Sequence, residues 1–347
     1  MIKIFCLRIL LIFLILANSA GAQTLGGNTV YNFLKLPAIP LLTAAGGINI
    51  SYNSKEIGFA MNNPALLEAD LHGQLNISFN NFLAGIKGYA LSGGYHHDQL
   101  NTSFGAQLFF LDYGSIPRTD AAGNENGVFR PVDFVAQISG SRKYLESWQY
   151  GFSLKFIHSS YEQYRSSGIA VDAGIVYKDS TKNFSASVLV KNMGFQLSSY
   201  SGIKDDLPFD LQVGITKRLE KAPFGFSVTA QQVHNFDLNY EDTVFNSNNG
   251  FVNKGGFINN LVNHFVLASH IYLGNNLEAT LGYNFLRRTE LNVGATGNGL
   301  NGFSVGLRAK FKKLEFQYAR ANYQRSIGYN QIGITLRLNQ LFGMGEL

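Results

Sequence analysis

The sequence has almost no cysteine, little proline and little charge. Its one cysteine is Cys6, and only 7 of the 347 residues are proline. Charged residues make up 15% of the chain, against about 25% in an average soluble domain. Without further cysteine the rest of the chain has no disulfide and no cysteine-ligated metal site. So little charge is atypical of a globule that water surrounds on all sides.

Neither positive nor negative residues are in large excess. The formal net charge is +5. Once Lys3 and Arg8 are removed with the N-terminal segment described below, 26 basic residues stand against 23 acidic ones, a net charge of +3. The basic residues do not cluster, so the sequence predicts no nucleic-acid partner.

The first 22 residues are typical of a secretory signal peptide. Lys3 and Arg8 supply positive charge, and residues 9–16 form an apolar run too short to cross a bilayer as a helix. The small residues 20–22 fit the cleavage pattern. We therefore expect residues 1–22 to be removed and the exported chain to begin at Gln23.

Beyond residue 73 apolar and polar residues alternate in long segments. In 149–156, for example, Tyr150, Phe152 and Leu154 alternate with Gln149 and Ser153. A period of two indicates strands with one apolar and one polar face. Their length suits a bilayer, which a tilted strand crosses in about 9–11 residues. The expected strands are 74–82, 86–95, 101–112, 130–142, 148–160, 166–178, 183–193, 207–218, 224–236, 263–273, 276–287, 301–312, 313–323 and 328–338, and the last one could continue to Phe342.

The connections between these strands alternate in length. All even-numbered connections are short, and the long ones, 113–129, 194–206, 237–262 and 288–299, are all odd-numbered. Bacterial outer-membrane barrels have this asymmetry, with short periplasmic turns and long outer loops. The sequence predicts an all-β fold, a transmembrane antiparallel β-barrel of about 14 strands over residues 74–347, located in the outer membrane.

Residues 23–73 lack this alternation and are expected to form an N-terminal plug inside the barrel, since a lumen of this width cannot be filled by wall side chains alone. A disordered tail is the alternative. Residues 41–45 could form helical turns ended by Gly46 and Gly47. The residues expected to carry the plug are Tyr31, Phe33, Leu36, Pro37, Asn63 and Pro64.

Two short motifs suggest chemistry but lack its structural context. Residues 297–302 match a glycine-rich dinucleotide motif, yet a strand follows where that motif needs a helix. Residues 302–306 match a serine-hydrolase elbow, but Ser304 lies within an alternating strand, on the polar face. An outer-membrane lipase would need Ser304 to face outward beside a histidine. The sequence thus predicts no enzyme, no cofactor and no metal site.

Several motifs resemble the PorV/PorQ family of the type IX secretion system, and its PorQ branch most closely. The likeness covers nearly the whole exported chain, although Ile39-Pro40-Leu41 departs from the family's usual Ser-Ala-Arg. The segments that carry it are 31–37, 44–47, 63–66, 112–114, 119–124, 164–172, 207–210 and 221–224.

The resemblance implies a barrel without catalysis that helps to attach exported cargo to the cell surface. It also implies partners: a PorZ-like surface protein, held by the barrel in an attachment complex with PorU and PorV. We expect loops 113–129 and 237–262 to dock the surface protein, because aromatic side chains anchor interfaces. The candidate docking residues are Phe129, Tyr240, Phe245, Phe251 and Phe257.

A second hypothesis is a passive channel for hydrophobic molecules, like fatty-acid transporters. That function would use the lumen and a movable N-terminal plug. Its distinguishing features would be an apolar pocket inside the plug and uptake that depends on residues 31–47.

Overall fold

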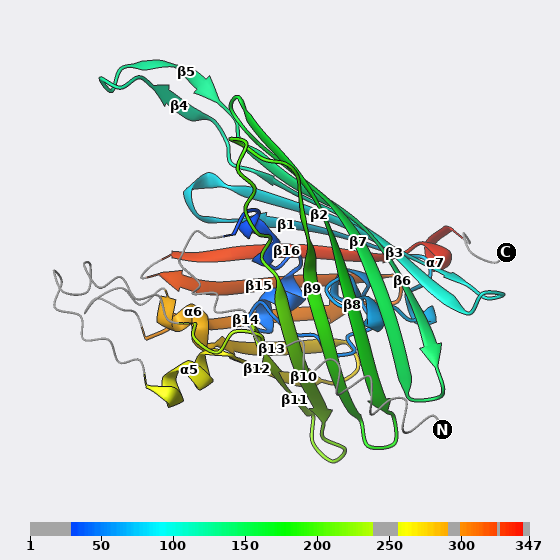
Figure 1. Cartoon of the computed structure of the whole chain (residues 1–347). Helices are drawn as coiled ribbons and strands as arrows, with labels where there is room; N and C mark the ends of the chain where they lie inside the picture. Colours follow the sequence, from blue (N-terminus) through cyan, green and yellow to red (C-terminus); the bar gives the residue numbers. More distant parts are fainter. Residues whose placement is uncertain (1–28, 239–255, 291–298, 325–326, 343–347) are drawn as a thin grey trace, which may run out of the picture.

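The computed structural model describes residues 29–238, 256–290, 299–324 and 327–342. Fourteen strands form a closed antiparallel barrel in which β1 pairs with β16 and every other neighbour follows in chain order (Figure 1). This confirms the predicted fold. The wall strands are β1 (Gln74–Asn81), β2 (Lys87–His97), β3 (Thr102–Asp112), β6 (Val132–Tyr144), β7 (Trp148–Tyr161), β8 (Tyr164–Asp179), β9 (Phe184–Ser198), β10 (Asp210–Arg218), β11 (Phe224–Ala230), β12 (Phe265–Leu273), β13 (Leu277–Asn284), β14 (Phe303–Lys310), β15 (Leu314–Gln324) and β16 (Ile327–Arg337).

The alternation of the sequence sets which side chains face outward. On β7, Phe152 is 58% exposed, whereas Gln149 and Ser153 are buried inside the barrel. The same pattern gives the whole wall an apolar outer surface, as a lipid-facing wall requires. Closure of the sheet leaves no unpaired strand edge in the hydrocarbon, where each unpaired backbone group costs several kcal/mol.

The connections confirm the predicted asymmetry. Every even-numbered connection is short, and the last of them is 311–313. The long connections, 113–131, 199–209, 231–264 and 285–302, all leave from the opposite end of the barrel. We call that end the outer end, because long loops lie outside the cell in bacterial barrels.

Several strand boundaries differ from the expected ones. β10 starts at Asp210 rather than 207, because Pro208 has no N–H to give a neighbouring strand. β11 ends at Ala230, not 236, since Gln232 adopts a positive φ of 51°. β13 ends at Asn284, not 287, where the Asn284 Oδ1 accepts the backbone N–H of Arg287 (3.0 Å) and starts α6 (Phe285–Glu290). β16 ends at Arg337, and α7 (Leu338–Phe342) replaces the expected continuation.

The connection 113–131 contains a hairpin that the sequence analysis did not predict. β4 (Ile116–Thr119) pairs with β5 (Glu125–Phe129), and the hairpin stands away from the barrel (Figure 1). At its tip, Asp120 accepts hydrogen bonds from the backbone N–H groups of Ala122 and Asn124, each at 2.9 Å. These side-chain bonds, rather than further pairing between the two strands, fix the turn.

The N-terminal segment lies inside the barrel (Figure 1). It consists of short helices: η1 (Asn32–Lys35), α2 (Pro40–Ala44), α3 (Ile57–Ala60), η2 (Pro64–Leu66) and η3 (Ala69–Leu71). Two further short helices, η4 (Leu83–Gly85) and α5 (Phe257–Asn263), lie in connections between wall strands. Among all described residues, no helix has the length and apolar character to cross a membrane.

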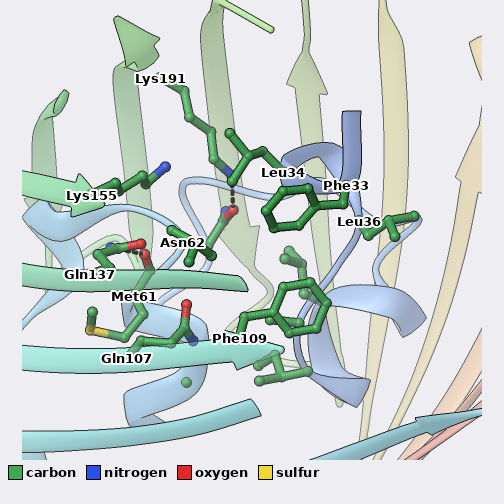
Figure 2. A pocket seen from close by; sticks show the side chains of 15 residues that line it. Phe33, Leu34, Leu36, Met61, Asn62, Gln107, Phe109, Gln137, Lys155 and Lys191 are labelled. Atoms are coloured by element: carbon green, nitrogen blue, oxygen red, sulfur yellow. Dashed lines mark hydrogen bonds between the residues drawn. The ribbon is translucent and has the colours of Figure 1, made fainter. Parts of the chain in front are cut away.

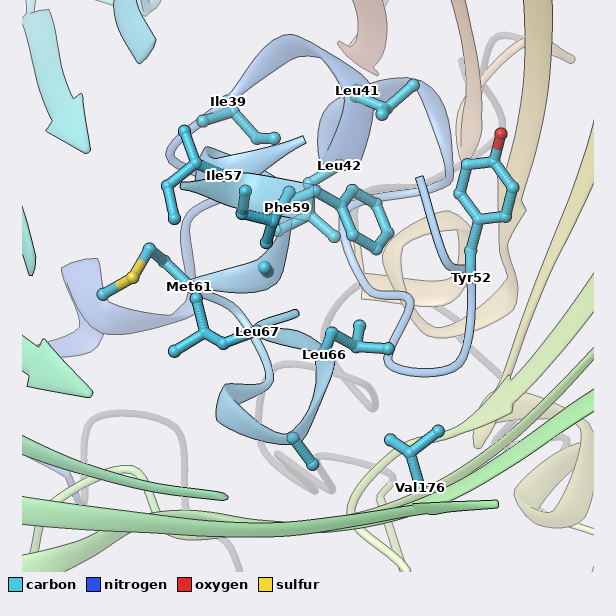
Figure 3. Packing of buried hydrophobic residues seen from close by; sticks show 13 residues of the cluster. Ile39, Leu41, Leu42, Tyr52, Ile57, Phe59, Met61, Leu66, Leu67 and Val176 are labelled. Atoms are coloured by element: carbon cyan, nitrogen blue, oxygen red, sulfur yellow. The ribbon is translucent and has the colours of Figure 1, made fainter. Parts of the chain in front are cut away.

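The main hydrophobic core belongs to this segment and not to the wall. Ile39, Leu42, Ile57, Phe59 and Leu67 pack against one another, all almost completely buried (Figure 3). Val176 of β8 is the wall residue that joins them. Residues 29–73 therefore fold as a compact body within the lumen.

Candidate functional site

The structure places all six predicted plug residues inside the barrel. Tyr31, Phe33, Pro37, Asn63 and Pro64 are buried, and Leu36 is half-buried. The Tyr31 hydroxyl lies 2.5 Å from Ser166 Oγ on β8, and Gln331 on β16 donates to the Pro37 carbonyl (3.3 Å). Both ends of the segment 31–37 are thus attached to the wall.

The segment 63–66 sits against two wall glycines. Gly151 of β7 and Gly174 of β8 are paired directly across the sheet, on its inner face. A Cβ added to Gly151 would lie 2.4 Å from the Pro64 carbonyl carbon, and one added to Gly174 would lie 2.2 Å from Asn63 Oδ1. Only glycine allows so close an approach.

Asn63 fixes this contact through its side chain, which is fully buried. Its Nδ2 donates to the carbonyl of Ile50 and to Ser187 Oγ on β9, both at 2.8 Å. Its Oδ1 accepts the backbone N–H of Ala65 (3.1 Å), which starts η2. One side chain therefore connects two parts of the plug to the wall.

A second pair of wall glycines receives α2. A Cβ on Gly306 of β14 would lie 2.5 Å from Ala44 Cβ, and one on Gly282 of β13 would lie 2.4 Å from the Ala44 carbonyl oxygen. Gly46 and Gly47 follow with φ of 90° each. They end the helix where the sequence analysis expected, because a residue with a side chain rarely takes this conformation.

Buried polar groups anchor the middle of the plug. The Tyr52 hydroxyl donates to Glu278 Oε1 on β13 (2.5 Å). Arg308 on β14 donates to the Ser54 carbonyl (2.8 Å) and pairs with Glu315 on β15 (2.5 Å). Since unpaired buried charges are costly, each ion holds the others in place.

A narrow cavity of about 50 Å³ remains between the plug and the wall (Figure 2). Room of this size holds only a few water molecules. One side of the cavity is apolar and the other carries polar groups and two lysines. The apolar side includes Phe33, Leu34, Leu36, Phe109 and Val135, and the polar side Asn62, Gln107, Gln137, Lys155 and Lys191.

The two lysines differ in their partners. Lys155 is buried and pairs with Asp172 of β8 (2.6 Å). The Nζ of Lys191, on β9, donates to Asn62 Oδ1 of the plug (2.6 Å, Figure 2). Among the described residues, no carboxylate lies within ion-pair distance of Lys191. Its charge is therefore available to a ligand in the cavity.

The wall is irregular beside these lysines. The ladder between β8 and β9 shifts register between Val171 and Ala173, and Asn192 has a φ of 56°. The extra residue turns both Lys191 and Asn192 toward the lumen, as a β-bulge does. The sequence analysis missed this site. Two consecutive polar residues, 191–192, break the alternation of β9 and are the signal that could have found it.

The predicted docking residues are only partly described. Phe129 is half-buried at the end of β5, and Phe257 is 70% exposed on α5, with its ring 5.2 Å from Phe236. The hairpin and α5 occupy different parts of the outer end (Figure 1). Tyr240, Phe245 and Phe251 lie outside the described residues.

The motif serine points inward, as its face predicts. Ser304 is 2% exposed and accepts a hydrogen bond from Arg287 Nη2 (2.6 Å). A lipase serine on the outer wall would need the opposite orientation. In the part of the chain that the structure describes, no three His, Cys, Asp or Glu side chains form a metal-binding group.

The closed wall, its apolar outer surface and its outer loops define an outer-membrane β-barrel with a plugged lumen. No protein-family model matches the chain, and neither does any curated protein. Solved structures do share the fold. The Pseudomonas putida toluene transporter TodX has a TM-score of 0.53 and 12% identity, covering 90% of this chain and 98% of that one. CymD, a monoaromatic hydrocarbon channel, has a TM-score of 0.53 and 13% identity, covering 88% and 97%.

Proposed function

We propose that this barrel carries hydrophobic molecules passively across the outer membrane, and that it prefers those with a carboxylate at one end. The observation that supports this function is the cavity at residues 33–42 of the plug. The cavity lies between plug and wall rather than inside the plug, and its apolar side favours a channel over a barrel that only docks a surface protein. The structural likeness to TodX and CymD, a toluene transporter and a hydrocarbon channel, favours the same function.

The cavity has two chemically different sides. Phe33, Leu34 and Phe109 offer an apolar surface to a hydrocarbon chain. Lys191 offers a positive charge to a carboxylate, and a charge-assisted hydrogen bond of this kind is about twice as strong as a neutral one. A fatty acid would place its head at Lys191 and its chain along η1.

Passage requires part of the plug to move, because the cavity is narrow. Residues 33–36 pack mainly through apolar side chains. Residues 44–66, in contrast, are fixed by the glycine contacts and by Tyr52, Ser54 and Asn63. We infer that residues 33–36, between the wall attachments at Tyr31 and Pro37, shift aside while the rest of the plug stays against the wall.

Ligand binding by the purified full chain tests this function. Dodecanoic acid should bind about tenfold more weakly to Lys191→Gln, whereas dodecanol should bind both proteins equally, because only the acid uses the charge. Lys143→Gln, at an exposed lysine of β6, is the matched control. Equal binding of the acid to all three proteins would refute the role of Lys191, and no binding of either ligand would refute the channel.

A second function, docking of a surface protein, is favoured by the β4–β5 hairpin. All four residues of β4 are exposed, and the hairpin extends beyond the barrel. On the resemblance to the PorV/PorQ family, the partner would be a PorZ-like protein in a type IX attachment complex with PorU and PorV.

Replacing residues 116–129 by a short Gly-Ser turn tests this docking. If the hairpin docks the partner, an affinity-tagged barrel extracted in mild detergent should lose its surface protein while still shifting on unheated gels. Deletion of residues 240–256 tests the second predicted loop in the same way. Recovery of the barrel alone from wild-type membranes would leave the channel as the better explanation.

A further inference from the structure

A second and larger cavity, of about 620 Å³, opens at the outer end of the barrel. Its walls come from β6, β7 and β8, from the outer connections 113–131 and 199–209, and from the first described residues of the plug. The size is typical of a small-ligand pocket. We call this cavity the tyrosine pocket; its lining is Thr29, Val30, Tyr31, Asn32, Phe33, Tyr113, Asp133, Ser159, Tyr161, Tyr164, Tyr200, Ser201 and Asp205.

Three of the tyrosines form a connected group. The rings of Tyr113 and Tyr161 lie 5.8 Å apart, and those of Tyr161 and Tyr200 lie 5.8 Å apart at 71°. The hydroxyls of Tyr113 and Tyr161 both donate to Asp133 Oδ2, at 2.6 and 2.8 Å. Burial and the bond to Asp133 raise the pKa of Tyr113, so its phenol remains a proton donor.

One of the two carboxylate oxygens of Asp133 is unpaired among the described residues. The residue is 2% exposed, and its Oδ1 has no hydrogen-bond partner among the described residues. Leaving a buried acceptor unpaired is unfavourable. A ligand that brings a donor would remove this cost, whereas a hydrocarbon would not.

The remaining lining restricts the ligand further. None of the lining residues is basic, and Asp133 and Asp205 are acidic, so an anionic ligand would be repelled. Hydroxyl and amide groups of Thr29, Asn32 and Ser159 can both donate and accept. A simple cation needs no such groups. A ligand with many hydroxyls uses all of them, and its C–H faces can lie against tyrosine rings.

From this arrangement we propose that the tyrosine pocket binds a neutral sugar at the cell surface, and that the Asp133 carboxylate turns so that its unpaired Oδ1, closed to solvent in this structure, accepts from a sugar hydroxyl. This site shares Phe33 alone with the lining of the cavity at Lys191. Its ligand is neutral, whereas the ligands proposed there are acids, so the two proposals can be tested independently. A surface-anchored glycan and a free oligosaccharide share this chemistry.

Glycan-array binding of the full chain in an amine-oxide detergent tests the proposal, because sugar-based detergents would compete. Neutral oligosaccharides should bind and acidic ones should not. Asp133→Asn and Tyr200→Ala should each weaken binding at least tenfold. Tyr144→Ala, at an exposed tyrosine of the opposite end, should leave it unchanged.

Further outcomes separate the alternatives. Binding to free maltotriose in solution as well as to immobilised glycans would point to a free sugar, and binding to immobilised polysaccharide alone to a surface glycan. Tetramethylammonium binding more tightly than any saccharide would overturn the proposal in favour of a cation site. So would the absence of saccharide binding, or binding that neither variant changes. If Asp133→Asn fails to assemble, Tyr200→Ala in the loop still decides.

Discussion

The Tyr52 hydroxyl of the plug donates to the Glu278 carboxylate of β13 over 2.5 Å, inside the barrel. The Tyr52 ring also stacks on His270 of β12, with centroids 3.8 Å apart. One plug side chain thus contacts two neighbouring wall strands. Arg308 completes the group by pairing with Glu315 and bonding to the Ser54 carbonyl. This part of the plug is therefore fixed to the wall.

Removing the arginine should destabilise the protein strongly. Arg308 pairs with Glu315 at 2.5 Å and with Glu278 at 3.5 Å. Arg308→Leu leaves both buried carboxylates without this cation, which costs about 3–5 kcal/mol. Urea unfolding in detergent, followed by tryptophan fluorescence and gel shift, measures the loss. Arg142→Leu, the same change at an exposed arginine of β6, should cost less than about 0.5 kcal/mol. Equal stability of the two variants would contradict the anchoring role.

The wall glycines give a second prediction. Gly151→Ala places a methyl group against the Pro64 backbone, and overpacking of this kind costs about 1–3 kcal/mol. Gly140→Ala is the control, because its new Cβ would meet its nearest neighbour, Phe104, at 3.8 Å. Thermal unfolding should rank Gly151→Ala below both the wild type and Gly140→Ala. If both variants unfold at the same temperature, the close contact between Gly151 and the plug does not contribute to stability.

Filling the inner cavity should block transport without affecting the wall. Leu34→Trp adds bulk where only about 50 Å³ is free, so uptake of dodecanoic acid into proteoliposomes should fall at least tenfold. Leu100→Trp, on a short turn at the opposite end, provides the control. Undiminished uptake by Leu34→Trp would show that hydrophobic molecules do not pass along η1.

The hairpin tip should depend on pH. The side-chain amide and the backbone N–H of Asn124 both donate hydrogen bonds to the Asp120 carboxylate. These bonds lower the pKa of Asp120 below its usual value of about 3.9. A lowered pKa stabilises the folded tip above about pH 4, and this stabilisation is lost as the pH falls through the lowered value.

A spin label reports this transition. Residues 23–347 contain no cysteine, so Ala121→Cys gives that chain a single labelling site. The label should be restrained at neutral pH and become mobile below about pH 4, whereas with Asp120→Ala it should be mobile throughout. A spectrum that does not change with pH would show that the carboxylate does not hold the turn.

Local patterns were enough to predict the wall. Strand positions follow from the period of two, and the barrel follows from strand length and from the parity of the connections. Errors arose where a single residue ended a strand. Asn284 starts a helix, Gln232 takes a positive φ, and Pro208 lacks an N–H. Such boundaries depend on one backbone group, and a periodic pattern averages over several residues.

The sequence by itself determined the class of this protein, because alternation and connection length act between neighbours along the chain. The tertiary structure decided the sites. Lys191 faces Asn62 only because the bulge turns it inward. The tyrosine pocket unites Tyr31, Tyr113, Asp133, Tyr161 and Tyr200 from five separate stretches of the chain. No local sequence pattern predicts that these residues lie together, because their proximity depends on closure of the barrel around the plug.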